Sequence, residues 1–459
     1  MKYSITNSIL LAGLLLLGIS ACEEEESAPI RVNFANEEVN LAENDASVAV
    51  EISFSRPVAA DGSISIDLSS TTLTYGESAD FYTLPTASDL TVTIPYTAGD
   101  ESVVMEVFPG AGLNIEQSES LVLSLPANEA LELGSQSEMT VVFSENFIAQ
   151  SGTIELNAGG ASFGLQAFVD LSKNKQTNVE KYSWDLGFAS EPDEFKVILN
   201  SGAYVMARRL DLTDLTQVNA EDTVGFGSEM AIPQYDPSIG AADWVDAPNG
   251  DLSDLAIGTV ASTDSENQIF IVKRDGEGRN WKKIRIIRAD NGYQIEYADI
   301  DSDQISIADI TKEDAYNFTF FDLDEGITDV QPEKESWDIQ YGTYTNLVNF
   351  GGFIPYGYSD FITLNRYQTQ VAKVLISDIS YADITAEDLS NLTFSSEINA
   401  LGSDWRIGGG PGTEPALYDD RFFVILDAQN NYYKLKFNRL TSSSGERGYP
   451  ELTYELITP

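Results

Sequence analysis

Two short stretches of one pattern decide the fold of this chain: Ser183-Trp184-Asp185-Leu186 and, 153 positions later (336 minus 183), Ser336-Trp337-Asp338-Ile339. Four other blocks recur in the same order at nearly the same offset. They are residues 168–171 with 320–323, 269–272 with 422–425, 280–286 with 431–437, and 292–297 with 449–454. Ordered repeats at a near-constant offset are the signature of a duplicated structural unit.

Each repeat has a simple physical interpretation. The Trp-Asp-Leu or Trp-Asp-Ile motif begins a strand that buries the indole, and the Asp hydrogen-bonds a turn. A long variable insert follows. A final hairpin alternates basic with apolar residues, so Lys283 and Arg285, and likewise Lys434 and Lys436, are expected on a solvated face.

The repeats resemble the HmuY family. The second is the closer match, through Trp337-Asp338-Ile339-Gln340-Tyr341 and Tyr432-Tyr433-Lys434-Leu435-Lys436-Phe437, and the first matches through residues 184–188 and 281–286. We place the two HmuY-like units at residues 160–312 and 313–459. The resemblance implies a β-rich, outer-membrane-anchored lipoprotein of Bacteroidetes that binds haem.

Haem ligation is the point at which the chain departs from the family. The resemblance implies axial ligands from His, or from Met in some relatives, and this chain has no His. Met206 and Met230 are the candidate ligands in the first unit, although Met206 lies in an apolar stretch that equally fits core packing. Tyr344 and Tyr356 are the candidates in the second unit, since tyrosinate can hold ferric haem. Such aromatic loops also occur as ordinary packing, or as platforms for sugars and peptides.

A first domain is expected at residues 30–148. Its strands alternate apolar and polar residues, as in Val48-Ala49-Val50-Glu51-Ile52-Ser53-Phe54, and turn residues separate them. About seven such strands predict an antiparallel β-sandwich of immunoglobulin-like class. The order of motifs, among them Val39-Asn40-Leu41-Ala42-Glu43 and Gly76-Glu77-Ser78-Ala79-Asp80-Phe81, resembles the Calx-β family.

Calcium binding is what that second resemblance implies. Hard Ca²⁺ takes six to eight oxygen ligands, and Glu43, Asp80, Glu116 and Glu119 are the carboxylates that could contribute. The acidic run that the family places before the paired glutamates is replaced here by residues 108–112, Phe-Pro-Gly-Ala-Gly. A spacer or interaction sandwich without calcium is the alternative.

The N-terminus has the pattern of a bacterial lipoprotein. Residues 1–21 are expected to be a signal peptide, since Lys2 precedes a short apolar run and small residues lead to Cys22. This resembles a lipobox, in which the Cys thiol is lipidated, and two or more acyl chains give stable anchoring. An ordinary signal peptide with an incidental Cys is the alternative. Residues 22–29 form an acidic tether, which resembles the export signal for surface lipoproteins; a periplasm-facing anchor is the other possibility.

The composition excludes several function classes. The chain has 459 residues, no His, one Cys, and a formal charge of −47. Imidazole catalysis, His-ligated metals and an internal disulfide are therefore ruled out. The negative charge disfavours nucleic-acid binding, and no spacing singles out a catalytic carboxylate pair, so we expect no enzyme.

The sequence therefore predicts an all-β protein: a Calx-β-like sandwich followed by a duplicated antiparallel module. Its expected function is non-catalytic ligand capture at the outer membrane, with haem or a porphyrin as the candidate ligand. The expected partners are the membrane, through the lipid anchor, and an outer-membrane transporter or another surface protein. The alternative is an adhesion or scaffold protein that has lost haem binding.

Overall fold

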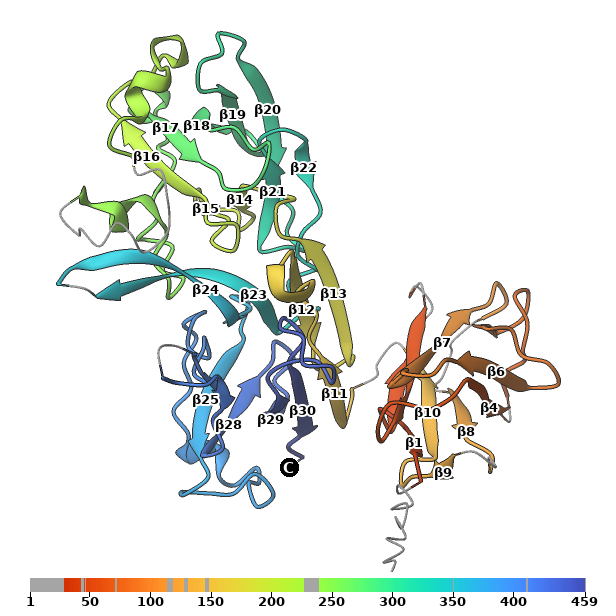
Figure 1. Cartoon of the computed structure of the whole chain (residues 1–459). Helices are drawn as coiled ribbons and strands as arrows, with labels where there is room; N and C mark the ends of the chain where they lie inside the picture. The colour runs from red at the N-terminus through yellow and green to blue at the C-terminus, as the bar shows by residue number, and fades with distance from the viewer. Residues whose placement is uncertain are drawn as a thin grey trace, which may run out of the picture.

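The structure, a computed structural model, describes residues 29–42, 45, 47–70, 72–113, 119–127, 131–144, 148–226, 239–349, 351–409 and 412–458. It is an all-β protein, as expected, with a smaller sandwich followed by a larger module of several sheets (Figure 1). No helix in this described part is long and apolar enough to cross a membrane.

The N-terminal domain is a sandwich of two five-stranded sheets. One sheet has the order β5 (Phe81–Leu84), β7 (Ser102–Pro109), β3 (Val48–Phe54), β1 (Arg31–Phe34) and β9 (Glu132–Leu133), and the other has β2 (Glu38–Asn40), β10 (Glu138–Phe143), β8 (Glu119–Ser124), β4 (Gly62–Ser69) and β6 (Thr91–Tyr96). Every second side chain of a strand points to the same face of its sheet. The alternating apolar residues therefore give each sheet one apolar face, and these two faces pack against each other.

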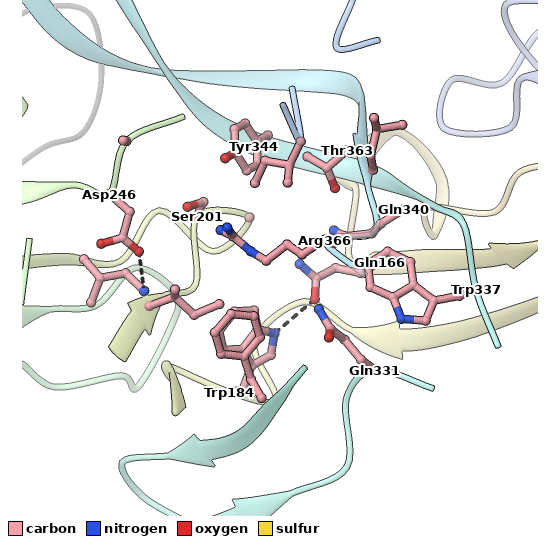
Figure 2. A pocket seen from close by; sticks show the side chains of 17 residues that line it. Gln166, Trp184, Ser201, Asp246, Gln331, Trp337, Gln340, Tyr344, Thr363 and Arg366 are labelled. Carbon is pink, nitrogen blue, oxygen red and sulfur yellow. Dashed lines mark hydrogen bonds between the residues drawn. The ribbon is translucent and has the colours of Figure 1, made fainter. Parts of the chain in front are cut away.

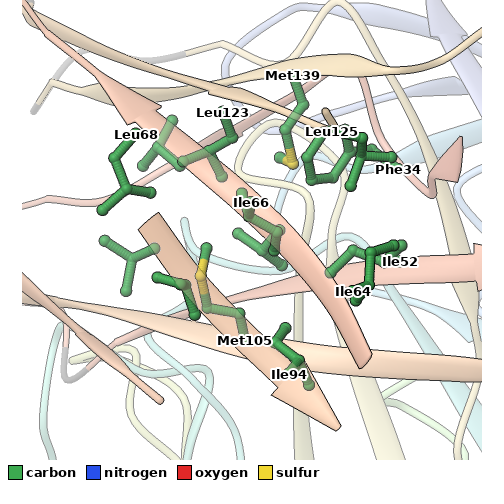
Figure 3. Packing of buried hydrophobic residues seen from close by; sticks show 14 of the residues in the cluster. Phe34, Ile52, Ile64, Ile66, Leu68, Ile94, Met105, Leu123, Leu125 and Met139 are labelled. Carbon is green, nitrogen blue, oxygen red and sulfur yellow. The ribbon is translucent and has the colours of Figure 1, made fainter. Parts of the chain in front are cut away.

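The core of this sandwich confirms the alternation. In β4 the side chains of Ile64, Ile66 and Leu68 are buried, and in β6 those of Val92 and Ile94 are buried. Figure 3 shows these aliphatic side chains meeting Met105 and Met139 between the sheets. The sheets are not wholly antiparallel, however. β9 pairs parallel to β1 and β10 pairs parallel to β2, because late strands of the domain return beside its first strands in the same direction.

The module has four larger sheets and one small one, all with antiparallel pairing. The first sheet has the order β11 (Ser151–Glu155), β30 (Glu451–Leu456), β29 (Tyr432–Arg439), β28 (Arg421–Leu426) and β25 (Gln370–Leu375), and the second has β13 (Lys175–Glu180), β12 (Leu165–Asp170), β23 (Ile339–Asn349) and β24 (Phe353–Leu364). The third has the order β15 (Val197–Leu199), β14 (Leu186–Ala189), β21 (Phe318–Asp322) and β22 (Gly326–Thr328), and the fourth has β16 (Met206–Leu210), β17 (Ile269–Lys273), β18 (Lys282–Ala289), β19 (Gly292–Asp299) and β20 (Ser306–Thr311). The small sheet pairs β26 (Arg406–Ile407) with β27 (Ala416–Leu417). Short 3-10 helices lie between them: η1 (Gly160–Ser162), η2 (Leu215–Gln217), η3 (Ala220–Thr223), η5 (Ala241–Trp244), η6 (Asp264–Glu266) and η7 (Leu389–Asn391).

The two repeats exchange their first hairpins. The β12–β13 hairpin opens the first repeat, yet β12 pairs with β23 of the second, with Phe168 opposite Gln340. The β21–β22 hairpin opens the second repeat, yet β21 pairs with β14 of the first, with Gly187 opposite Phe320. The two repeats therefore form one interleaved body, and the boundary between them at residues 312 and 313 stays a prediction.

Both Trp-Asp motifs hold the exchanged hairpins in the same way. Asp185 accepts a hydrogen bond from the Leu323 amide at 2.9 Å, and Asp338 accepts one from the Leu171 amide at 2.8 Å. Each indole also packs edge-on against the other repeat's hairpin. The ring centroids of Trp184 and Phe320 lie 4.7 Å apart, and those of Trp337 and Phe168 lie 5.1 Å apart. The structural interpretation of the motif is thus confirmed.

Two of the four basic residues of the final hairpins are buried, so the expectation of a solvated face was wrong for Lys283 and Lys434. Lys283 is 1% exposed and donates to the Val218 carbonyl, and Lys434 is 8% exposed and donates to the Tyr381 carbonyl. The variable inserts fold back over these hairpins and bury the aliphatic stems, while their carbonyls take the ammonium protons. Arg285 stays partly exposed, and Lys436 is exposed, as expected.

In each repeat, one buried side-chain amide holds the segment between the exchanged hairpin and the Trp-Asp motif, and this gives a prediction. Asn200 Nδ2 donates to the carbonyls of Lys181 and Trp184, and Asn365 Nδ2 donates to those of Lys334 and Trp337. We expect Asn200→Ala and Asn365→Ala each to lower the free energy of unfolding by about 2–4 kcal/mol, because buried carbonyls lose their donors. Urea unfolding measures this.

The exposed Asn391 provides the matched control, since Asn391→Ala should change stability by less than about 0.5 kcal/mol. Equal effects at all three positions would contradict the role given to the two buried amides.

Candidate binding site

A small cavity lies on the seam between the two repeats. Its volume is about 60 Å³, and both motif indoles, Trp184 and Trp337, line it (Figure 2). The other labelled side chains come from both repeats: Gln166, Ser201, Asp246, Gln331, Gln340, Tyr344, Thr363 and Arg366. Pockets for drug-sized ligands measure about 300–1,000 Å³, so this one has room for a few waters and not for a porphyrin.

The two indoles in this cavity differ in their hydrogen bonding. Trp184 Nε1 donates to Gln166 Oε1 at 3.0 Å. Trp337 Nε1 and Gln331 Oε1 have no hydrogen-bond partner among the described residues. The difference follows from the sequence, because the position equivalent to Gln166 in the second repeat is the apolar Phe318 (166 plus 152).

Charged side chains lie at the other end of the cavity. Asp246 accepts hydrogen bonds from the Leu199 amide at 2.7 Å and the Ala256 amide at 3.1 Å. Burial raises the pKa of Asp246 to about 6, although both hydrogen bonds act against the rise. Arg366 reaches across the cavity and donates to the Gly250 carbonyl (Figure 2). The Arg366–Gly250 hydrogen bond joins the second repeat to the first, whereas the Asp246 contacts lie within the first repeat.

A row of aromatic rings leads from this cavity toward the surface, and we call it the tyrosine strip: Tyr344, Phe361, Tyr358 and Tyr356. Tyr344 stacks on Phe361 with centroids 4.9 Å apart, Phe361 lies 5.7 Å from Tyr358, and Tyr358 lies 4.8 Å from Tyr356. Tyr344 pairs with Tyr358 across the β23–β24 hairpin, so these side chains share one face of it. Tyr344 is buried, whereas Tyr356 and Tyr358 are half-exposed.

The opposite face of the same hairpin rests on the first repeat. Thr343 Oγ1 donates to the Gly202 carbonyl at 2.6 Å, and Thr345 Oγ1 donates to the Ser201 carbonyl at 2.8 Å. A Cβ atom at Gly357 would lie 2.7 Å from the Tyr204 ring, so only glycine permits this approach. The hairpin is therefore fixed to the first repeat while its tyrosine strip faces away from that contact.

The candidate haem ligands lie in different surroundings. Met206 is 2% exposed and belongs to a hydrophobic cluster of the first repeat. Tyr344 donates its hydroxyl to the Pro248 carbonyl at 2.9 Å, and burial raises the pKa of its phenol well above the usual range. Tyr356 is half-exposed on the tyrosine strip. Met230 lies outside the described residues. The structure thus brings Tyr344 and Tyr356 to one face and leaves Met206 in the core.

The calcium candidates form no site in the described part of the chain. Asp80 Oδ2 accepts hydrogen bonds from the backbone and side chain of Thr74, both at 2.6 Å, and so caps its own turn. Glu119 begins β8. Glu43 and Glu116 lie outside the described residues, and among those described no group of three or more Asp, Glu or Cys side chains is arranged to hold a metal ion. Calcium binding stays a prediction.

Sequence reasoning missed Phe361 and Arg366 as neighbours of the candidate tyrosines. The spacing of Tyr356 and Tyr358 by two residues indicates a shared strand face. Phe361 breaks that spacing because the pairing of β23 with β24 shifts register between Gly342 and Tyr344. On β24 the irregular stretch opposite this shift includes Asp360, which has a positive φ of 53°. No periodic pattern of the sequence reveals such a bulge.

The comparison with protein families agrees with the duplication. The family model described as HmuY protein matches residues 165–301 and 314–454, which together make up more than half of the chain. The chain belongs to the HmuY family. No curated protein matches this chain.

Three solved structures with weak similarity cover different shares of the chain. The apo HmuY analogue from Tannerella forsythia is 9% identical and has a TM-score of 0.20, with 68% of this chain and 99% of that one covered. The apo CBD1 domain of Calx is 16% identical with a TM-score of 0.21, covering 25% and 95%. A putative carbohydrate binding protein from Bacteroides ovatus is 9% identical with a TM-score of 0.19, covering 94% and 98%.

The unequal indoles generate a prediction. Trp184→Phe removes the N–H group that donates to Gln166 Oε1. Because Gln166 is only 2% exposed, this side-chain oxygen would be left buried and unpaired. Trp337→Phe removes an N–H group that has no partner. We expect Trp184→Phe to cost about 1–2 kcal/mol more in the free energy of unfolding than Trp337→Phe, measured by urea unfolding. Equal costs would show that the Gln166 contact contributes nothing.

Proposed function

We propose that this HmuY family member captures a planar tetrapyrrole, haem or a related porphyrin, without catalysis, by stacking it on the tyrosine strip. The observation that carries the proposal is the strip itself: two half-exposed rings backed by two buried ones, on one face of a long hairpin. The runner-up is an adhesion or scaffold protein, which the same exposed aromatic side chains would also suit.

Stacking fits the described side chains better than a pair of axial ligands. Met206 is enclosed in the core, and the Tyr344 hydroxyl is already bonded to a carbonyl. That leaves Tyr356 as the partly exposed candidate ligand in the described part of the chain. Flat aromatic rings attract one another through offset stacked or edge-on contacts, which require no metal.

A cation beside the strip supports binding of an anionic porphyrin. Arg406 Nη2 donates to the Ser359 carbonyl at 2.6 Å, in the residue that follows Tyr358. Burial raises the pKa of the Tyr358 phenol, and the charge of Arg406 acts against that rise. Arg406 Nε also lies 3.8 Å from Asp360 Oδ2, so this guanidinium offers the carboxylate groups of a ligand only the N–H groups that these contacts leave over.

Two titrations test the proposal. The chain from residue 23 onward should give saturable absorbance changes with micromolar hemin and with metal-free protoporphyrin IX, with dissociation constants within about threefold of each other. Tyr356→Ala combined with Tyr358→Ala should weaken both by about tenfold, since two ring contacts are lost.

Tyr82→Ala is the matched control, because Tyr82 stacks on Phe108 in the sandwich, 4.8 Å between centroids, away from the strip. Binding of neither ligand would refute the proposal and favour the scaffold function. Binding of hemin alone would show that iron is ligated, and loss of that binding in Tyr356→Phe or Met230→Ala would then identify the ligand.

We also propose that Cys22, which lies outside the described residues, carries the lipid anchor, and that the protein faces the cell exterior from the outer membrane. Cys22→Ser should move the protein from the membrane fraction to the soluble fraction, because no acyl chain would then hold it. Protease added to intact cells should degrade the wild-type protein. Unchanged membrane association of the variant would contradict the anchor.

A further inference from the structure

The exchanged hairpins end in two corresponding clusters of ionisable residues, most of which are buried. The first clasp consists of Asp185, Asp322, Asp324, Arg274, Arg279 and Lys282. Arg274 Nε lies 2.9 Å from Asp185 Oδ1 and its Nη1 lies 2.6 Å from Asp324 Oδ2, while Lys282 Nζ lies 2.5 Å from Asp324 Oδ1. Arg279 also pairs with Asp185. Lys282 Nζ also lies 2.6 Å from Asp299 Oδ1, so three cations contact the buried Asp185 and Asp322 as well as the more exposed Asp324 and Asp299.

The second clasp consists of Asp338, Asp170, Asp427 and Tyr433, and it keeps two carboxylates of the first clasp without its cations. Asp338 and Asp170 correspond to Asp185 and Asp322 by the repeat offsets of 153 and 152. In the first repeat Val272 pairs with Lys282, and in the second Ile425 pairs with Tyr433. Tyr433 therefore takes the position of Lys282. By the same alignment, Asp427, directly after β28, takes the position of Arg274, directly after β17.

Only neutral donors satisfy the second clasp. Asp170 Oδ1 accepts from Ser172 Oγ at 2.7 Å, Asp338 Oδ2 from the Leu171 amide, and Asp427 Oδ2 from Asn431 Nδ2 at 2.7 Å. In the described part of the chain, no ammonium or guanidinium nitrogen lies within 4.0 Å of these carboxylates, whereas the Lys173 backbone amide donates to Asp170 Oδ1 at 3.0 Å. The buried Tyr433 hydroxyl has no hydrogen-bond partner among the described residues.

The titratable groups around the second clasp are mostly acidic. Lys173, in the turn after β12, is the cation that lowers the pKa of Asp170, against a larger rise from burial. Tyr454 of β30 donates to Asn174, and its pKa is raised by burial and by the charges of Tyr433, Asp170, Asp338 and, from the sandwich, Glu38.

Three ionised carboxylates cannot remain buried together without cations, because burial and mutual repulsion both disfavour the charged form. Burial raises the pKa of Asp338 strongly, and Asp170 adds to the rise. Burial likewise raises the pKa of Asp170 and of Asp427. The carboxylates are not arranged to hold a metal ion, so bound protons remain as the means of removing charge.

We propose that the second clasp is a proton-dependent contact: protonation of Asp338, Asp170 and Asp427 holds the β12–β13 hairpin on β23, and their ionisation loosens it. The first clasp is the permanent counterpart, held by its own guanidinium and ammonium groups. The asymmetry gives one of the two exchanged hairpins a dependence on pH.

The direction of the effect follows from linkage. A carboxyl group whose pKa is raised by folding binds more protons in the folded state, so its contribution to stability is lost as the pH rises through that raised pKa. Burial also raises the pKa of Asp185, but there the charges of Arg279 and Arg274 act against the rise. No ammonium or guanidinium group is among the causes that act on Asp338, whose pKa is raised strongly. The second clasp should therefore weaken with rising pH more than the first.

Hydrogen exchange on the unmodified full chain tests this directly. The Leu171 amide donates to Asp338 and the Leu323 amide donates to Asp185, so they form a matched pair. Between pH 5.5 and pH 8, the protection factor of Leu171, corrected for intrinsic exchange, should fall by about tenfold or more relative to that of Leu323. A constant ratio would overturn the proposal.

Two isosteric variants add a second measurement. Asp338→Asn removes the charge and should raise the melting temperature at pH 8 by about 3 °C or more and flatten its pH dependence, whereas Asp185→Asn, which loses two ion pairs, should lower it. Asp427→Asn should act as Asp338→Asn does. Equal losses for Asp338→Asn and Asp185→Asn would overturn the proposal. So would a rise in melting temperature with millimolar Ca²⁺ that Asp338→Asn abolishes, because a cation would then neutralise the cluster.

Discussion

The module depends on one kind of contact: a buried aspartate accepts a hydrogen bond from a backbone amide of the other repeat. Asp185 and Asp338 make it reciprocally, with Leu323 and Leu171. An unpaired buried amide or carboxylate costs free energy, so each Asp fixes where the other repeat's hairpin must lie. The exchanged hairpins, the edge-on indole contacts and the seam cavity are all consequences of this pair of hydrogen bonds.

The sequence predicted the elements of this fold well and their partners poorly. The period-2 alternation of residues 48–54 and 64–68 correctly indicated sandwich strands, because one buried face imposes that pattern directly. The repeat revealed the duplication. It could not reveal that β12 pairs with β23, because both arrangements bury the same apolar side chains and preserve the same motifs.

In the candidate site, too, the sequence predicted individual residues but not all of their neighbours. Tyr344 and Tyr356 were foreseen and lie on one hairpin face, whereas Phe361 joins them through a register shift that local sequence does not encode. The buried Lys283 and Lys434 were misjudged, since their covering segments come from inserts far along the chain. Long-range contacts of this kind decide burial and are invisible to periodicity.

The duplication lets each copy support the other. The second repeat contributes the tyrosine strip, and the first repeat provides the Gly202 and Ser201 carbonyls that support the hairpin beneath it. Mutual support of this kind allows the two copies to diverge in charge. The replacement of Arg274 and Lys282 by Asp427 and Tyr433 is the clearest divergence.

The exchange of hairpins is the central claim, and methyl NOE spectroscopy of the full-length chain tests it most directly. Val169 lies opposite Ile339 in the exchanged arrangement, and both side chains are buried. We predict a strong NOE between the methyl groups of Val169 and Ile339. A strong NOE between Val169 and Leu186, in place of that one, would contradict the exchange, because each hairpin would then pair within its own repeat.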